Sequence, residues 1–143
     1  MNITVIVQAR LGSKRLPGKI LKKIYKNFNS LELIFKRLSK LKNCSRLVFA
    51  IPKKDKKLSN YLSKKNFPFF TGSLTNVLDR YYKCAIREKS DIIVRITADC
   101  PLIDPKIVDD AVSIFLKKKN IDLLSNYSPP TFPDGLDVAV FSF

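Results

Sequence analysis

The chain has 143 residues and carries 27 Lys and Arg against 12 Asp and Glu, a formal net charge of +15. A hydrophobic content of 45% and a charged content of 27% exclude a disordered tail, a collagen-like repeat and a disulfide scaffold. At this length we expect a single domain over residues 1–143, with room for a real hydrophobic core.

The usage of histidine and cysteine excludes several kinds of site. The sequence has no histidine, so Ser-His and Cys-His nucleophile pairs cannot form within this chain. Cys44, Cys84 and Cys100 are odd in number and lack CxxC spacing, so neither a disulfide framework nor a zinc site is indicated. This use of cysteine predicts a reducing, cytoplasmic location. We expect no membrane partner, because no apolar run approaches the ~20 residues of a membrane helix.

The excess of positive charge suggests one possible function, a basic nucleic-acid-binding module, because clustered cations neutralise phosphates. The densest runs, residues 53–57 and 117–119, lie between or at the ends of periodic segments, where a solvated surface explains them. No aromatic residues interleave with these runs as base-stacking platforms. We therefore expect no nucleic-acid partner and keep this module as the alternative.

The apolar pattern predicts strands that alternate with helices. Ser30 is expected to cap a helix whose apolar stripe runs over residues 31–41, and Asp104 with Pro105 is expected to open a later one that reaches residue 115. Further helical segments are expected around 58–62 and 77–86. The expected strands are residues 3–7, 47–51, 67–70, 92–96, 121–124 and 136–141.

This alternation predicts the fold class. Helical crossovers between strands are right-handed, which indicates an α/β, Rossmann-like, mostly parallel sheet with helices on both faces. In such sheets ligands bind outside the carboxyl ends of the strands. Two polar segments follow predicted strands, one after Val7 and one around Asp99, and both are candidates for chemistry.

The first segment is a basic loop interrupted by glycines. Gly12 and Gly18 allow backbone amides to approach an anion, and the cations of the loop neutralise phosphate charge. These cations are Arg10, Lys14, Arg15 and Lys19. The loop is not a Walker A motif, because five residues separate the glycines and an isoleucine follows the last lysine. Phosphate binding and an ordinary basic surface turn both remain open on these residues.

The second segment presents Asp99 at the end of a buried strand, with Pro101 after it. A carboxylate there can hold Mg²⁺ whose remaining ligands are water and substrate phosphates. The alternative is a turn or helix-capping aspartate. Together with the basic loop, Asp99 indicates a nucleotide- or phosphate-binding α/β domain.

Motifs along most of the chain carry a resemblance to a known family. They are VQARLGSKRLPGK at 7–19, GS at 72–73, NVLDRYY at 76–82, VRITADCPLIDP at 94–105 and FPDGLDV at 132–138. In this order they resemble the sugar-acid cytidylyltransferases, the group of the CMP-KDO and CMP-sialic acid synthetases. The spore coat polysaccharide biosynthesis protein F branch is the most similar.

The resemblance implies a nucleotide-diphospho-sugar transferase (GT-A-like) fold. It also implies transfer of CMP from CTP to a sugar or sugar acid, with release of pyrophosphate, in surface polysaccharide or glycoconjugate biosynthesis. Ala9, Arg10 and Ser13 would border the cytidine and the phosphates. Arg15 and Lys19 would bind the triphosphate and act in catalysis.

The same resemblance assigns the acidic positions. Asp99 would ligate Mg²⁺, the implied cofactor, and would act in catalysis with the basic loop. Asp79 and Arg80 would bind the sugar substrate. Asp134 and Asp137 are further candidates, with a turn and an edge strand as their alternative explanations.

Two features depart from the family. Ala98 stands where its members usually have glycine, so the backbone there would approach phosphate less freely. Members also continue well beyond the FPDGLDV motif, which implies that this chain is the N-terminal portion of a domain, truncated at the C-terminus, whose full-length form is a homodimer. The alternatives are an inactive fragment, or a nucleotidyltransferase or glycosyltransferase that uses another nucleotide on this fold.

Overall fold

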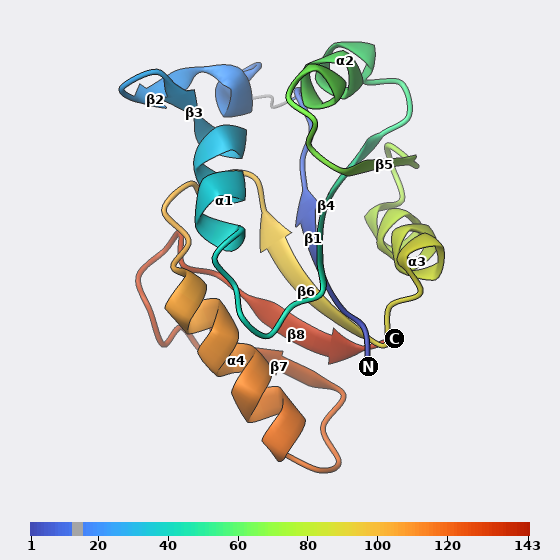
Figure 1. Ribbon diagram of the computed structural model, residues 1–143, viewed down its shortest axis with the longest axis vertical. Helices are drawn as coiled ribbons and strands as arrows, with labels where there is room; N and C mark the ends of the chain where they lie inside the picture. The colour runs from blue at the N-terminus through green and yellow to red at the C-terminus, as the bar shows by residue number, and fades with distance from the viewer. Residues whose placement is uncertain (13–15) are drawn as a thin grey trace.

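A six-stranded sheet with the order β5-β4-β1-β6-β8-β7 forms the centre of the molecule in a computed structural model, which describes residues 1–12 and 16–143 (Figure 1). β1 lies parallel to β4 and β6, and β4 lies parallel to β5, whereas β8 is antiparallel to both β6 and β7. The strands are β1 (Ile3–Gln8), β4 (Arg46–Pro52), β5 (Phe69–Gly72), β6 (Ile92–Thr97), β7 (Leu123–Ser125) and β8 (Ala139–Ser142). The predicted mostly parallel α/β sheet is confirmed.

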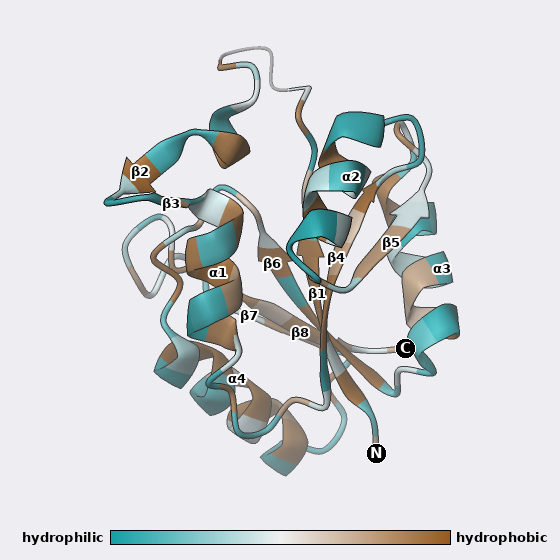
Figure 2. Cartoon of the chain, turned by 45° about the horizontal axis from the view of Figure 1, so that its top comes forward, coloured by the Kyte–Doolittle hydropathy of each residue, from teal (hydrophilic) through white to brown (hydrophobic). Residues whose placement is uncertain are grey.

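Helices cover both faces of this sheet, as expected. Apolar side chains of α1 (Ser30–Leu38), α2 (Lys56–Lys64) and α4 (Pro105–Lys117) pack with Val5, Val7 and their neighbours in the main core. α3 (Val77–Glu88) covers the opposite face, where Tyr81 and Cys84 pack on Ile6. Figure 1 shows α1 and α4 on one side of the sheet and α3 on the other. The brown strands between teal helix surfaces in Figure 2 show the same layering.

The start of α1 differs from the prediction. Asn29, not Ser30, is the cap: its side chain accepts from the Glu32 amide at 3.0 Å, and the Glu32 carboxylate accepts from the Asn29 amide at 3.0 Å. This reciprocal capping box places Ser30 in the first turn, so its hydroxyl is available for another contact. The helix ends at Leu38, and Leu41 packs on the core from the turn that follows.

A short hairpin and a 3-10 turn were not predicted. They are η1 (Lys19–Leu21), β2 (Lys23–Tyr25) and β3 (Phe28–Asn29). All three residues of β2 are exposed, so the apolar alternation that marks a half-buried strand is absent there. The hairpin lies next to the start of α1, at the end of the molecule where β1 and β6 finish (Figure 1).

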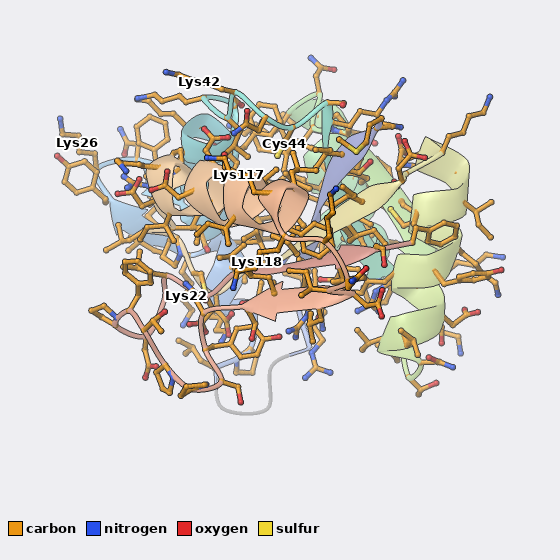
Figure 3. All side chains as sticks on the ribbon, turned by 90° about the horizontal axis from the view of Figure 1, so that it is seen from below. Lys22, Lys26, Lys42, Cys44, Lys117 and Lys118 are labelled. Atoms are coloured by element: carbon orange, nitrogen blue, oxygen red, sulfur yellow. The ribbon has the colours of Figure 1, made fainter. Side chains whose placement is uncertain are left out.

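Lysines project from separate parts of the molecule. Figure 3 shows Lys26 and Lys42 at different places on the surface, and Lys117 and Lys118 lying at the end of α4. No helix in the described part of the chain is long and apolar enough to cross a membrane. The three cysteines are free thiols.

Candidate functional site at the carboxyl edge of the sheet

The parallel strands β1, β4, β5 and β6 all end at one edge of the sheet. The polar segments singled out in the sequence follow two neighbouring strands, β1 and β6. η1 and the β2–β3 hairpin lie at this same edge, at the top of Figure 1. The topology therefore brings the basic loop and the Asp99 turn together.

Contacts of the residues on either side of Lys19 hold it at the edge. The Gly18 amide donates to the Leu11 carbonyl at 3.0 Å. Gly18 has φ +67°, a left-handed conformation that glycine adopts without a steric penalty. The next turn is anchored by Ile20, which is buried in the main core. Lys19, which starts this turn, is thus held at the strand ends.

The turn that carries Asp99 is fixed from two directions. The Ala98 amide donates to the Gln8 carbonyl of β1 at 2.9 Å, and the Ala98 methyl packs in the main core. The Ser30 hydroxyl of α1 donates to the Ala98 carbonyl. Arg37, also of α1, donates from Nε to the Ile103 carbonyl at 2.6 Å. The alanine that replaces the family's glycine is accommodated in the core.

Lys19 and Asp99 meet in a direct ion pair, with 3.0 Å between Nζ and Oδ2. The two side chains are 37% and 53% exposed, so a ligand can reach both. Partial burial raises the pKa of Asp99, but hydrogen bonds from Lys19 and Thr97 and the charge of Lys19 outweigh it, and the pKa lies below its usual value. The carboxylate is therefore ionised at neutral pH beside a cation.

Asp99 is suited to a hard divalent ion. The described residues hold no cluster of three or more His, Cys, Asp and Glu side chains that could enclose a metal by themselves. One ionised, half-exposed carboxylate matches the way Mg²⁺ is usually bound, with one or two carboxylates and the rest of its shell from water and substrate phosphates. The residues present fit a metal that arrives with a phosphate ligand.

Arg80, on the α3 side of the edge, is fully buried. Its Nη1 donates to the Ser73 carbonyl at 2.6 Å, whereas Nε and Nη2 have no partner in the described part of the chain. Burial is the largest cause of the lowered pKa of Arg80; Tyr81 opposes it and the charge of Arg10 adds to it. A buried guanidinium with two unpartnered nitrogens is costly unless a ligand completes it.

Asp79 lies one residue earlier on α3, in a different setting. It lines a pocket of about 560 Å³ at the ends of β4 and β5, and its carboxylate is 3.0 Å from the ammonium of Lys83. The other residues lining this pocket are Lys53, Lys54 and the segment 71–75. Asp79 and Arg80 thus face different surroundings although they are adjacent.

The remaining predicted residues divide into three cases. Ala9 is buried and its amide donates to the Ala50 carbonyl at 3.1 Å, so its side chain belongs to the core. Arg10 is exposed and close enough to Arg80 to influence its pKa. Ser13 and Arg15 lie outside the described residues.

Two residues of this edge were missed in the sequence. Gln8 ends β1 with a buried Oε1 that has no partner among the described residues. Arg95, on β6, interrupts an otherwise apolar strand. A charged residue inside a run of isoleucine and valine is a signal that could have identified Arg95, whereas Gln8 gave no comparable signal.

Comparison with known proteins reveals similarity over nearly the whole chain. Residues 4–131 match the cytidylyltransferase family. An uncharacterised protein of Methanocaldococcus jannaschii, MJ1063, is 37% identical over 145 residues, which cover 100% of this chain and 58% of that protein. The spore coat polysaccharide biosynthesis protein SpsF of Bacillus subtilis is 37% identical over 76% of this chain and 47% of its own length. The chain thus spans about half the length of these relatives.

Solved structures agree with this result. A cytidylyltransferase from Leptospira borgpetersenii superposes with a TM-score of 0.92 at 36% identity, over 99% of this chain and 60% of that one. A CMP:2-keto-3-deoxy-manno-octonic acid synthetase complexed with CTP has a TM-score of 0.81 at 14% identity, over 99% of this chain and 74% of that one. The second likeness concerns the fold alone, which is the nucleotidyltransferase fold expected from the sequence.

Proposed function

Because the chain belongs to the cytidylyltransferase family, we propose that it transfers CMP from CTP to a hydroxyl of a sugar or sugar acid, with release of pyrophosphate. The observation that carries the proposal is the Lys19–Asp99 pair, 3.0 Å apart at the strand ends. It supplies a cation for phosphate oxygens and a carboxylate for a divalent ion at one place. The pathway we propose is surface polysaccharide biosynthesis, the process in the name of the Bacillus subtilis relative.

In this reaction the acceptor oxygen attacks the α-phosphorus of CTP, and the bond from that phosphorus to the oxygen bridging the β-phosphate breaks. Pyrophosphate leaves with the bond electrons, and the acceptor hydroxyl loses its proton to solvent. Lys19 and Arg15 stabilise the charge that grows on the departing phosphates. Catalysis of this kind depends on positioning and electrostatics, so a chain without histidine can perform it.

Asp99 would hold Mg²⁺ in this proposal. When bound, the ion neutralises the phosphate oxygens and orients them. Lys19 already neutralises the Asp99 carboxylate, and each partner is more than one-third exposed. Because exposed ion pairs contribute little to the stability of the folded chain, replacing this pair by contacts with a nucleotide costs little free energy.

The cytidine and its phosphates are assigned to the neighbourhood of Ala9 and Arg10; Ser13, which the family resemblance groups with them, lies outside the described residues. Arg80 has two nitrogen donors without partners among the described residues, and both are enclosed, so a nucleotide would reach them only after neighbouring side chains move. The choice of CTP over UTP rests on the match of residues 4–131 to the cytidylyltransferase family.

The test measures binding and turnover separately. Thermal unfolding with Mg²⁺ and each of CTP, UTP, ATP and GTP should show the largest stabilisation with CTP, since a ligand of the folded state raises stability by mass action. Pyrophosphate release should require both CTP and a sugar acceptor. Equal stabilisation by all four nucleotides would contradict the CTP assignment, and stabilisation by CTP in Asp99→Ala equal to that of the parent would contradict the site.

A further inference from the structure

The β2–β3 hairpin presents two large apolar side chains that no described residue covers. Residues 22–27 are all exposed, including Ile24 at 54% and Tyr25 at 58%. Successive side chains of a strand point to opposite faces, so both faces of β2 are open. Figure 2 shows the hairpin extending outward beside the start of α1, with a hydrophobic stretch on β2. An adjacent pair of exposed apolar residues on a projecting element is a candidate contact surface.

The same hairpin carries positive charge that no carboxylate in the described part of the chain neutralises. The first 31 residues of the sequence contain seven Lys and Arg and no Asp or Glu. Lys22, Lys23 and Lys26 are exposed, and none of them forms an ion pair within the described residues. Lys23 Nζ donates to Asn27 Oδ1 at 3.3 Å, and Lys26 Nζ lies 5.4 Å from the centre of the Tyr25 ring. The three lysines therefore keep their full charge beside the exposed apolar pair.

The base of the hairpin is fixed to the body of the molecule. Asn29, which ends β3, is 4% exposed and caps α1. Its Nδ2 also donates to the Tyr61 hydroxyl of α2 at 2.6 Å. Phe28 is half-buried, with the ammonium of Lys36 5.0 Å from the centre of its ring. On the other side, η1 is held by the buried side chain of Ile20. The exposed end of the hairpin thus has a defined direction relative to the sheet.

Lysines around a tyrosine and an aliphatic side chain match the chemistry of a membrane–water interface. Tyrosine places its ring at the level of the lipid head groups and leaves its hydroxyl in water. An aliphatic side chain enters the boundary of the acyl chains, and the long stems of lysines keep their ammonium groups among the head groups. A nucleic acid would use the lysines and Tyr25, but it offers Ile24 no apolar surroundings. The combination therefore favours a lipid surface.

We propose that the β2–β3 hairpin docks on the surface of a membrane that contains anionic lipids. Ile24 and Tyr25 enter the interface, and Lys22, Lys23 and Lys26 contact the lipid phosphates. The carboxyl edge of the sheet then lies near the bilayer, because η1 leads from this edge into β2. This inference goes beyond the proposed function and does not depend on it. The expectation of no membrane partner concerned a spanning helix, which a surface contact does not need.

The competing explanation is general attraction of a chain with a net charge of +15 to any anionic surface. Lys117, Lys118 and Lys119 provide a charge-matched control, because they are three adjacent exposed lysines at the end of α4. Figure 3 shows Lys117 and Lys118 well apart from Lys26. General attraction predicts equal losses from either set of three lysines. Docking by the hairpin predicts a loss for its own lysines and a further dependence on its apolar pair.

The first experiment is co-sedimentation with phosphatidylcholine vesicles that contain or lack phosphatidylglycerol. We expect the parent to bind only the anionic vesicles and to dissociate in high salt. Replacement of Lys22, Lys23 and Lys26 by Gln should weaken binding roughly 100-fold, about fivefold for each lysine. Ile24→Ser combined with Tyr25→Ser should weaken it at least ~10-fold, the effect of removing buried apolar side chains. Replacement of Lys117, Lys118 and Lys119 by Gln should leave binding close to that of the parent.

The second experiment reports on the hairpin directly. The sequence has no tryptophan, so Tyr25→Trp introduces a single fluorescent reporter. Its emission should shift to shorter wavelength on anionic vesicles and should be quenched by brominated acyl chains, because the ring enters the interface. Tyr82→Trp, on α3, is the matched reporter, since Tyr82 is similarly exposed at 54%. Its emission should not change.

Three results would overturn the inference: no binding of the parent to anionic vesicles, equal losses in the two lysine variants, or unchanged emission of Tyr25→Trp. Duplex DNA and single-stranded RNA are tested alongside the vesicles. Tighter binding of either nucleic acid, lost in the hairpin lysine variant and kept in Ile24→Ser with Tyr25→Ser, would assign the hairpin to nucleic acid instead. CTP-induced thermal stabilisation, measured without vesicles, should be the same in the hairpin variants and the parent. Its absence in the parent would count against the proposed function alone.

Discussion

The two cations at the edge of the sheet, Lys19 and Arg80, have opposite surroundings. Lys19 is 37% exposed and already paired with a carboxylate, whereas Arg80 is fully buried and has two nitrogens without partners among the described residues. Separating an exposed ion pair costs little free energy, so the Lys19–Asp99 side is suited to charges that change during a reaction. A buried, incompletely paired guanidinium gains most from a fixed partner, so the Arg80 side is suited to recognition.

The largest effect is expected on the exposed side. Lys19→Ala and Asp99→Ala should each lower the rate of CTP-dependent pyrophosphate release at least ~100-fold, the scale of losing one preorganised charge stabiliser. Lys22→Ala is the matched control, because Lys22 follows the same 3-10 turn and is exposed. Rates near that of the parent in both site variants would remove the catalytic role of the pair.

For substitutions of Arg80, on the buried side, we expect the CTP affinity and the free energy of unfolding to change in opposite directions. Arg80→Met replaces an incompletely paired charge by an apolar side chain of similar length, a change that is often neutral or stabilising by about 1–4 kcal/mol. The free energy of unfolding without ligand should hold or rise in urea titrations, while CTP affinity falls about 10-fold, the loss of one strong hydrogen bond. A variant that loses stability and keeps CTP affinity would show that Arg80 is structural.

The close packing of Gly72 against Arg80 allows a second test of the buried side. A Cβ at Gly72 would lie 2.9 Å from Arg80 Cγ and 3.0 Å from Phe70 Cε1. Gly72→Ala should therefore destabilise the chain by roughly 1–3 kcal/mol, the usual cost of overpacking. If the clash is with Arg80, combining Gly72→Ala with Arg80→Ala should recover part of the loss in urea unfolding, and strict additivity of the two changes would argue against it.

A smaller effect on kcat is expected for Ser30, which holds the Asp99 turn in place but does not belong to the Lys19–Asp99 ion pair. Ser30→Ala removes the hydroxyl that donates to the Ala98 carbonyl and should lower kcat about fivefold, the value of one neutral hydrogen bond. The KM for CTP should rise by no more than a similar factor, because Ser30 acts through the Asp99 turn, which contributes to both CTP binding and turnover in the proposed function. Ser30→Thr keeps the hydroxyl and should recover most of kcat; equal losses in the two variants would point to packing instead.

The smallest effect concerns pH. The pKa of Asp99 lies below its ordinary value of 3.8, so the folded carboxylate binds its proton less readily than the unfolded one does. Its contribution to stability is then present above that pH and is lost as the pH falls through the lowered pKa. The difference in Tm between the parent and Asp99→Asn should be constant from neutral pH to about pH 5, shrink below about pH 4, and decrease in high salt. A difference that grows on acidification would contradict the lowered pKa.

Much of the fold could be predicted because strands such as β1 are apolar on both faces and helices such as α3 repeat their apolar residues every three or four positions. The start of α1 was misplaced by one residue, since Asn29 and Ser30 are equally good caps and only the bond from Asn29 to Glu32 favours the first. The exposed β2–β3 hairpin left no apolar pattern to detect.

The candidate site was predictable in part, for a similar reason. Lys19 and Asp99 follow strands that end at the same edge, so topology alone brings them near each other. That Arg80 is buried without a carboxylate, that Ser30 holds the Asp99 turn, and that Arg95 opens onto a pocket with Asp137 all depend on contacts between segments far apart in the chain. No local pattern encodes such contacts.

The sequence by itself determined which segments are strands, which ends carry charge, and which family the motifs resemble, because periodicity and residue type act over short distances along the chain. Only the tertiary structure decided which of the charged side chains are paired, which are buried without a full set of partners, and which share a pocket. The pKa of Asp99 and the free donors of Arg80 arise from burial and from neighbours brought in by folding, and neither exists in the extended chain.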